Sequence, residues 1–331
     1  MICKDLNFHR RLSVAPMLDF TDRHERFFLR LLSKNVLLYT EMIVANALLH
    51  AGPRFLQHDP VENPVALQLG GSDPKMLAEC AKIVEGAGFD EVNLNCGCPS
   101  ERVQSGSFGA MLMKQKDLVA ECVQSMKKEV QIPVTVKTRI GVDEFTGWEF
   151  FEDFIRTVHS AGCDTFIIHA RTARLRGYSP KENREKPAIH YETVYKLKEV
   201  FPQLNISVNG DIRTIDQAKE HLKHVDGVMM GRAVYANPWM LATADSEIYG
   251  GKDFAPQTRK ALLEAFLPYV QKAQAEGCPL SVLTKHLYGI FTGFPGGRKF
   301  RQILSEGAPK ALDGAALIRT AMDAVEEIGF P

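Results

Sequence analysis

The chain has 331 residues, of which 40 are basic, 40 are acidic and 45 % are hydrophobic, and its formal net charge is zero. This composition excludes an intrinsically disordered chain, a collagen-like fibre and a disulfide-stapled miniprotein. Zero net charge argues against a protein that coats nucleic acid with its whole surface, but it allows a local basic face. The length exceeds the roughly 250–300 residues that one hydrophobic core usually holds, so we expect a large domain and a smaller one.

Cysteine usage and hydropathy indicate a cellular compartment. The seven cysteines form no regular framework, which fits a reducing environment. The sequence contains no run of 18 or more apolar residues, so it predicts no membrane span. We therefore expect a cytoplasmic protein.

Short apolar runs alternate with helical patterns up to about residue 240. The runs are continuous rather than alternating, which is typical of parallel strands that are covered on both faces. The predicted strands are 12–17, 36–42, 64–70, 91–97, 133–141, 165–171, 205–211 and 226–232.

The segments between these strands predict helices. Residues 72–86 begin with a serine and end near two glycines, and residues 148–161 place apolar side chains on one face. Thr214 and Gln217 form a capping-box pattern before residues 218–222. Eight strand-plus-helix units predict a (β/α)8 barrel. The alternative is a doubly wound open sheet, but no G-x-G-x-x-G follows the first strand.

The pattern changes after about residue 250. Four helices are predicted there, at 256–276, 280–292, 298–305 and 313–328. The expected fold class is therefore α/β, a (β/α)8 TIM barrel followed by a small all-α helical domain. We assign residues 1–250 to the barrel and residues 251–331 to the helical domain. Two long loops, 98–115 and 172–190, are expected to be functional.

Polar side chains and glycines lie toward the C-terminal ends of the predicted strands, where a barrel carries its reactive groups. They are Gln68, Asn95, Cys98, Lys137, Arg139, His169, Asn209, Gly210, Asp211, Gly231 and Arg232. The glycines and the arginine after the last two strands favour a phosphate site, although such glycines can also serve tight turns alone. Cys98 could be a nucleophile, a metal ligand, a general acid or a buried inert thiol. Cys96 and Cys98 are a poor zinc signal, and we predict no metal site.

At these residues the chain resembles the tRNA-dihydrouridine synthases, and among them the A-type bacterial enzymes. The matching motifs occur in order from about residue 12 to about residue 306. They are Val14-Ala15-Pro16-Met17, Thr21-Asp22, Tyr39-Thr40-Glu41-Met42, Gln68-Leu69-Gly70, Asn93-Leu94-Asn95, Cys98-Pro99-Ser100, 134–139, His169-Ala170-Arg171, 179–184, Gly231-Arg232 and 293–298.

The resemblance implies an enzyme that binds FMN at the top of the barrel. It would reduce uridine to 5,6-dihydrouridine in the D-loop of tRNA, at positions 20 and 20a, with NADPH as the electron donor. Hydride would go to C6 of the uracil, and Cys98 would give a proton to C5. The residues expected to hold FMN are Pro16, Met17, Gln68, Lys137, His169, Asn209, Gly210, Asp211, Gly231 and Arg232. A-type relatives often have a glycine where this chain has Asp211.

The resemblance also implies contacts with RNA. The segments 172–190 and 278–305 are rich in Lys and Arg, as phosphate binding requires, although a solvated basic surface is the alternative. The expected tRNA-binding residues are Asn95, Arg139, Lys181, Asn183, Arg184, Arg298 and Arg301. Two rival functions are an FMN barrel that acts on a free pyrimidine, like a dihydroorotate dehydrogenase, and a non-catalytic RNA-binding protein. No obligate protein partner is evident.

Overall fold

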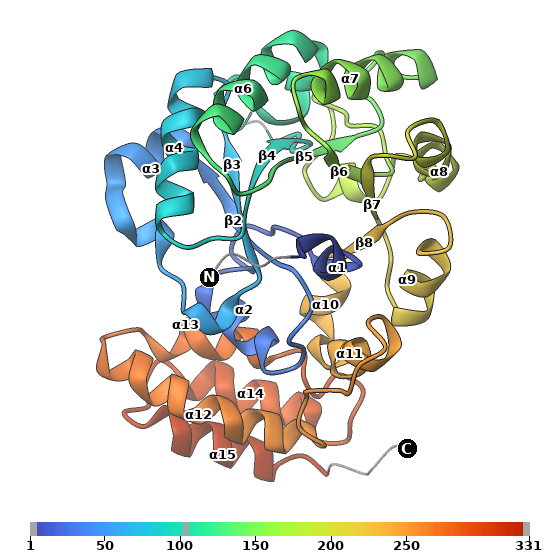
Figure 1. Ribbon diagram of the computed structural model, residues 1–331. Coiled ribbons are helices and arrows are strands. Elements are labelled where there is room, and N and C mark those ends of the chain that lie inside the picture. The colour runs from blue at the N-terminus through green and yellow to red at the C-terminus, as the bar shows by residue number, and fades with distance from the viewer. Residues whose placement is uncertain (1–4, 101–102, 104–105, 327–331) are drawn as a thin grey trace. The chain divides into compact units, whose positions relative to one another are not determined.

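The computed structural model describes residues 5–100, 103 and 106–326, and its central element is a sheet of eight parallel strands. The strands are β1 (Leu12–Val14), β2 (Leu38–Val44), β3 (Val65–Gly70), β4 (Glu91–Cys96), β5 (Val134–Arg139), β6 (Thr165–His169), β7 (Asn205–Asn209) and β8 (Gly227–Met230). β1 pairs with β8, and Val14 N donates to Leu37 O at 2.9 Å, so the sheet closes nearly completely on itself (Figure 1). The predicted (β/α)8 barrel is confirmed, and the open doubly wound sheet is wrong.

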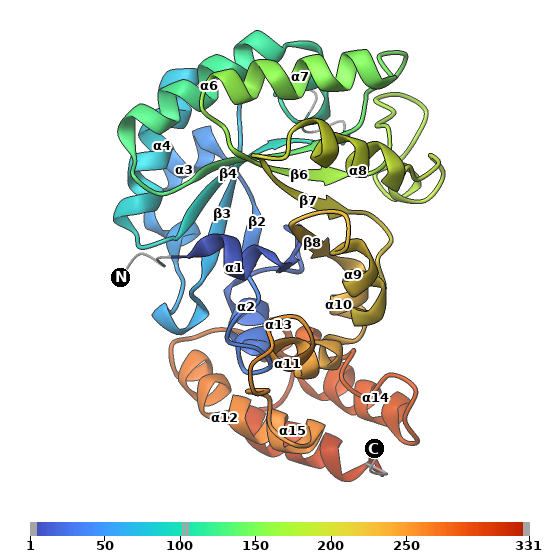
Figure 2. The ribbon, with the colours of Figure 1, turned by 45° about the vertical axis from the view of Figure 1, so that its right-hand side comes forward.

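Helices surround the strands of the barrel (Figures 1 and 2). They are α1 (Leu6–Arg10), α3 (Ala45–Ala51), α4 (Pro74–Gly86), α6 (Lys116–Glu129), α7 (Trp148–Ser160), α8 (Tyr191–Val200) and α9 (Ile215–His221). α4 starts two residues later than the sequence indicates, because Asp73 rather than Ser72 caps it and accepts from Met76 N at 2.8 Å. Thr214 caps α9 as expected, accepting from Gln217 N at 3.1 Å. Within the described residues, no helix combines the length and the apolar character needed to cross a membrane.

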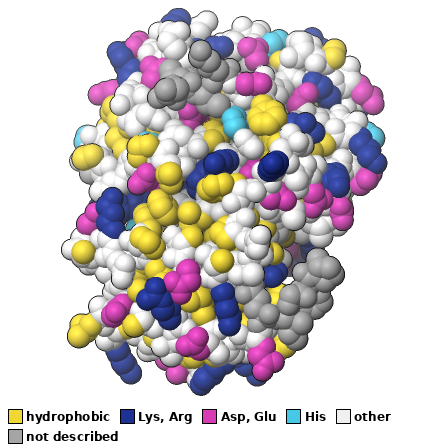
Figure 3. Space-filling model, turned by 60° about the horizontal axis from the view of Figure 1, so that its bottom comes forward, with side chains coloured by type: hydrophobic (Ala, Val, Ile, Leu, Met, Phe, Trp, Pro, Cys, Tyr) yellow, Lys and Arg dark blue, Asp and Glu magenta, His cyan; other side chains and the backbone are white. Residues whose placement is uncertain are grey.

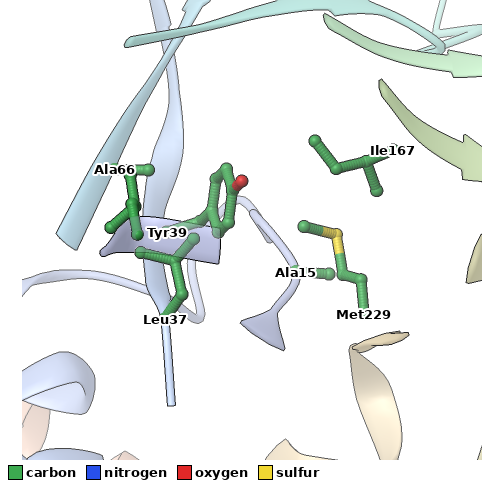
Figure 4. Packing of buried hydrophobic residues seen from close by; sticks show 7 residues of the cluster. Ala15, Leu37, Tyr39, Ala66, Ile167 and Met229 are labelled. Carbon is green, nitrogen blue, oxygen red and sulfur yellow. The ribbon is translucent and has the colours of Figure 1, made fainter. Parts of the chain in front are cut away.

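Apolar side chains fill the interior of the barrel. Ala15, Leu37, Tyr39, Ala66, Ile167 and Met229 lie together there (Figure 4). Leu6 of α1 joins the same cluster, so α1 covers the N-terminal end of the barrel. Each large aliphatic side chain buried in this way contributes about 1.5–3 kcal/mol. The barrel is therefore a packed core rather than a pore, and ligands can enter only at the C-terminal mouth.

A second compact unit is built from two segments of the chain, Asp22–Asn35 and Arg232–Pro331, while the barrel forms the first unit. Its helices are α2 (Arg23–Arg30), α10 (Arg232–Ala236), α11 (Ala244–Glu247), α12 (Arg259–Ala275), α13 (Leu280–Thr284), α14 (Gly297–Gly307) and α15 (Gly314–Asp323). Helices α12 to α15 correspond to the four helices predicted near the C-terminus. The one predicted over 280–292 is shorter, because only a 3-10 turn (Lys285–Leu287) follows Thr284.

Side chains of α2 hold its segment within the second unit. The ring of Phe27 stacks on that of Tyr269 with 4.0 Å between centroids. His286 is buried between two carboxylates of this segment, with Nε2 2.9 Å from Asp22 and Nδ1 3.1 Å from Glu25. These contacts join residues that are more than 200 positions apart in the sequence.

The boundary between the compact units differs from the one expected at residue 250. α11 shows the physical reason, because its Asp245 accepts hydrogen bonds from Ser33 Oγ at 2.6 Å and from Lys34 N at 3.0 Å. Residues 232–250 therefore group with the helical unit. Local periodicity, on which the sequence prediction rests, contains no information about such distant partners.

Candidate active site

Five of the predicted site residues lie together at the mouth of the barrel because their strands are in register. Lys137 on β5 is opposite Asn95 on β4. Arg139 is opposite His169 on β6, which in turn is opposite Asn209 on β7. Lys137 and Arg139 are two residues apart, so their side chains leave the same face of the strand. The mouth thus gathers two basic side chains, an imidazole and two amides.

The mouth is electropositive. Lys137 Nζ donates to Asn209 Oδ1 at 3.0 Å. Burial away from water lowers the pKa of Lys137 to about 7, and the charge of Arg139 contributes to this shift. No carboxylate among the described residues raises this pKa. Burial and the same cations hold the pKa of His169 well below 6.5, so its imidazole is neutral at pH 7. Such a site suits an anionic ligand.

We expect Lys137→Met to remove a pH dependence of stability. The pKa of Lys137 is about 7 in the folded protein and 10.5 ordinarily. The unfolded chain therefore binds more protons between these values, and the wild type gains stability as the pH rises through this window. The gain in the free energy of unfolding is up to about 1.4 kcal/mol per pH unit.

Urea unfolding at several pH values between about 7 and about 10 checks this expectation. The wild type and the exposed control Lys128→Met should share one slope of stability against pH, and Lys137→Met should have a smaller one. Equal slopes in all three proteins would contradict the lowered pKa.

The loop after β4 carries Cys98 and is held from two sides. Asn95 Oδ1 accepts hydrogen bonds from the amides of Gly97 at 3.1 Å and Cys98 at 3.0 Å. On the other side, Cys98 O accepts from Ala110 N at 2.8 Å. Gly109 has a φ of 77°, and a Cβ there would lie 2.4 Å from Cys98 O, so glycine is required. The half-buried thiol of Cys98 therefore projects from a fixed backbone.

Two cations share the mouth with this thiol. The electrostatic interaction with Cys98 raises the pKa of Lys137 and of Arg139, so both basic groups lie within range of the thiol. Burial lowers the pKa of Arg139 to about 10, which leaves it charged at neutral pH. Arg139 also fixes two loops, since its Nε donates to Gly97 O at 2.9 Å and its Nη1 to Asn183 O at 3.0 Å.

Some residues predicted to contact RNA form hydrogen bonds within the protein instead of projecting from it. Asn183 is fully buried; its Oδ1 accepts from Arg174 N at 2.7 Å and its Nδ2 donates to Arg174 O at 2.8 Å. It shapes the loop between β6 and α8, as Arg139 shapes the Cys98 loop. Lys181 and Arg184 of the β6–α8 loop are exposed. An RNA could therefore reach these two side chains.

At the end of β7, the backbone of Gly210 lies close to the ring of His169, and the backbone of Asp211 has a positive φ. Gly210 has a φ of 127°, and a Cβ on it would lie 2.9 Å from His169 Cδ2. Asp211 has a φ of 52°, in the left-handed region that favours glycine, which explains why a glycine suits this position. Its carboxylate is 2.9 Å from Arg213 and 3.9 Å from Arg171, so its charge is balanced.

The turn after β1 lies beside the end of β8. Pro16 and Met17 are half-buried there. A Cβ on Gly231 would lie 3.4 Å from Ala15 Cβ and 3.5 Å from Met17 Sδ. Two predicted parts of the cofactor site, the apolar turn and the glycine after β8, are therefore adjacent.

Three further predicted residues, Arg232, Arg298 and Arg301, belong to the second unit. Arg232 opens α10. Arg298 is exposed and Arg301 half-buried on α14, and the exposed Lys299 between them adds a third cation to the same turn. On the face shown in Figure 3, basic and acidic side chains are interspersed, in keeping with zero net charge. The three cations Arg298, Lys299 and Arg301 nevertheless make the start of α14 a local basic patch.

Sequence reasoning assigned Asn95 to the site but missed the hydrogen-bonded set of polar side chains to which it belongs inside the barrel. Glu91, Asn93 and Asn95 alternate along β4, and all three are buried. Thr135 on β5 is fully buried and opposite Asn93. Polar residues at every second position of a strand predict a hydrogen-bonded row on one face, and this pattern could have revealed them. Across the part of the chain that the structure describes, no group of three or more His, Cys, Asp or Glu side chains could hold a metal.

Known proteins resemble this chain over most of its length. A family model described as Dihydrouridine synthase (Dus) matches residues 13–326. A Shewanella oneidensis protein named tRNA-dihydrouridine(20/20a) synthase is 52 % identical over 320 residues, covering 97 % of this chain and 95 % of that protein. A protein of the same name from Escherichia coli K12 is 54 % identical over 308 residues, covering 93 % and 89 %. A solved complex of 2-naphthoyl-CoA reductase with 2-naphthoyl-CoA shares the fold, with a TM-score of 0.56 and 10 % identity over 71 % of this chain and 49 % of that one.

Proposed function

The chain belongs to the dihydrouridine synthase family, and from this premise we propose that it reduces uridine to 5,6-dihydrouridine at positions 20 and 20a in the D-loop of tRNA. The names of relatives that match nearly the whole chain support this substrate and favour it over a free pyrimidine. The observation that carries the proposal is the barrel mouth itself, where the half-buried Cys98 shares one electropositive site with Lys137 and Arg139.

We propose FMN as the cofactor and NADPH as its reductant. The mouth fits an anionic flavin, because no carboxylate of the described residues raises the pKa of Lys137. A Cβ on Gly210 would lie 2.9 Å from His169 Cδ2, so glycine keeps the backbone close to this ring. Bound FMN would supply the hydride that C6 of the uracil receives. The residues proposed to hold it are Pro16, Met17, Gln68, Lys137, His169, Asn209, Gly210, Asp211, Gly231 and Arg232.

Cys98 is proposed to protonate the other carbon of the double bond. When C6 gains a hydride, negative charge develops at C5 and O4, and the S–H of Cys98 delivers a proton to C5 as a general acid. The sulfur is left as a thiolate, which Lys137 and Arg139 stabilise from within the same mouth. Hydride at C6 and proton at C5 together account for the two hydrogens that the product gains.

The target base must leave its stack to reach the mouth, so the RNA backbone needs an anchor outside the barrel. Exposed cations suit this role, because each phosphate contact releases counterions. We propose as anchoring residues the exposed Lys181 and Arg184 of the β6–α8 loop, the exposed Arg298 of α14 and, beside it, the half-buried Arg301.

We expect the double substitution Arg298→Ala and Arg301→Ala to weaken tRNA binding and to flatten its dependence on salt. Each lost phosphate contact lowers the slope of log Kd against log salt by about 0.7–0.9. Filter binding at a series of salt concentrations measures the slope. Lys310→Ala, another exposed cation of this unit, serves as the control and should leave the slope unchanged. A double variant with the wild-type slope would assign RNA binding to another surface.

The proposed function is tested by incubating the purified protein with FMN, NADPH and unmodified tRNA, followed by nucleoside mass spectrometry and position mapping. Dihydrouridine at positions 20 and 20a is the expected result. Dihydrouridine at other positions would overturn the site assignment. Reduction of free uracil or orotate without reduction of tRNA would favour the pyrimidine enzyme, and RNA binding without any reduction would favour the non-catalytic protein.

A further inference from the structure

We propose that Thr135 and Asn93, which lie below the mouth and act on it through Gln68 and Asn95, are positioning residues for the proposed reaction. Together with Glu91 they fix the orientation of the side-chain amides of Gln68 and Asn95, and through Asn95 they fix the backbone of Cys98. The hydrogen-bonded row itself does not depend on the proposed function; its effect on dihydrouridine formation rests on that function.

The row begins deep in the barrel at Glu91. Thr135 Oγ1 donates to Glu91 Oε1 at 2.6 Å. Asn93 Nδ2 donates to Thr135 Oγ1 at 2.8 Å, and Gln68 Nε2 donates to Asn93 Oδ1 at 2.7 Å. Strand register makes these contacts possible, because Gln68, Asn93 and Thr135 are opposite one another on β3, β4 and β5. The row therefore crosses three strands at one level of the barrel.

From Gln68 the row rises to the mouth. Asn95 Nδ2 donates to Gln68 Oε1 at 2.8 Å. Asn95 Oδ1 then accepts from the amides of Gly97 and Cys98, at 3.1 and 3.0 Å. The last acceptor of the row is thus the group that holds the thiol-bearing loop.

Chemistry at the two ends gives the row a single direction. An ionised Glu91 can only accept hydrogen bonds, and the backbone N–H groups of Gly97 and Cys98 can only donate. A side-chain amide has two orientations, but each orientation forces that of its neighbour. If donors and acceptors are assigned one after another, starting from Glu91 or from the Cys98 loop, the result is the same. Thr135 donates to Glu91, and Asn95 accepts from the loop.

The lower end is anchored by charge. Arg10 Nη2 lies 2.6 Å from Glu91 Oε2 in a buried ion pair. Tyr39 OH donates to Glu91 Oε1 at 2.6 Å, and burial beside this carboxylate raises the pKa of Tyr39 well above 10, so the phenol stays a donor. Arg10, Tyr39 and Thr135 thus all donate to Glu91, which fixes the direction of the row.

Burial makes the row stiff. Gln68, Asn93 and Thr135 are each at most 1 % exposed. Turning one amide over would place donor against donor or acceptor against acceptor away from water, at a cost of about 1–3 kcal/mol for each unsatisfied group. Gln68 and Asn95 therefore offer a preset pattern of donors and acceptors before any ligand arrives, which is the preorganisation that a site needs.

Thr135→Val tests the row, because valine keeps the shape of threonine but lacks the hydroxyl. We expect kcat for dihydrouridine formation to fall about tenfold or more, with KM for tRNA changed less than about twofold. Thr138→Val is the matched control: it lies on the same strand, is equally buried, and its hydroxyl has only 3.4 Å contacts with backbone carbonyls outside the row. The control should keep wild-type kcat. Thr135→Ser, which restores the hydroxyl, should recover most of the loss.

A second measurement follows the loop without relying on catalysis. We expect iodoacetamide to alkylate Cys98 at least about threefold faster in Thr135→Val than in the wild type, because a freed Asn95 amide loosens the loop. The half-buried Cys278 of the second unit is the internal reference, and mass spectrometry separates the two products. Thr135→Ala gives the same comparison if the valine variant folds poorly.

The outcomes are distinct. Equal kcat and equal alkylation rates in Thr135→Val and Thr138→Val would overturn the positioning role, as would a failure of Thr135→Ser to recover activity. A wild type that forms no dihydrouridine would overturn the proposed function alone, while the alkylation rates would still decide whether the row holds the Cys98 loop.

Discussion

Cys98→Ala is expected to lower dihydrouridine formation by about 10²–10⁴-fold, the contribution typical of a positioned general acid. The substitution removes the only side-chain atom that can give a proton from this loop position, but it leaves the hydrogen bonds of the Cys98 backbone to Asn95 and Ala110 in place. Flavin content should therefore match that of the wild type, as visible absorbance of the purified protein would show. Single-turnover reduction of tRNA by the pre-reduced enzyme isolates the affected step.

Cys96→Ala is the matched control for this prediction. Cys96 is two residues away on β4, fully buried, and burial raises its pKa well above 9, so it has no route to a substrate. We expect it to lose stability but to keep most of its activity per folded molecule. A Cys98→Ala enzyme that forms dihydrouridine at a rate close to that of the wild type would remove Cys98 from the proposed chemistry.

The second large effect concerns stability. Glu91→Gln should lower the free energy of unfolding by about 3–5 kcal/mol, because it leaves the charge of Arg10 buried without its partner. Both side chains of this ion pair are at most 4 % exposed, and Nη2 and Oε2 are 2.6 Å apart. Tyr39 and Thr135 would lose a charged acceptor at the same time. Urea unfolding at pH 7 provides the measurement.

An exposed ion pair supplies the contrast. Arg319 and Glu264 are 2.9 Å apart, yet about half of each side chain is open to solvent. Glu264→Gln should therefore cost less than about 1 kcal/mol. If the two Glu→Gln variants lost equal stability, the buried pair would not be the anchor of the barrel interior that its geometry indicates.

The strands of the barrel are predictable from sequence because each is a short apolar run, but their ends are not. The run 205–211 stops at Asn209 in the structure, since Gly210 and Asp211 adopt positive φ values that no strand can hold. The run 12–17 stops at Val14, and a turn follows at residues 18–20, where Phe20 N donates to Met17 O at 3.1 Å. Hydropathy reports burial, whereas a strand ends where the backbone changes conformation.

In the candidate site, too, some features could be predicted from the sequence and others could not. Residue type and position place Lys137, His169 and Asn209 at one mouth, because they lie toward the C-terminal ends of neighbouring strands that share a register. The roles of Asn95, Arg139 and Asn183 could not be predicted in this way. Each has the chemistry of a substrate ligand, but their inward hydrogen bonds depend on loops that the sequence pattern does not position.

The helical unit uses both an early and a late part of the polypeptide, and this arrangement constrains biosynthesis. On the ribosome, α2 emerges near the beginning of translation, but Tyr269 and His286, against which its side chains rest, follow more than 200 codons later. Likewise, β1 cannot form its hydrogen bonds with β8 until β8 has been synthesised. The nascent chain must therefore keep the apolar face of α2 exposed until synthesis is almost finished, a period in which a holding chaperone would protect it from aggregation.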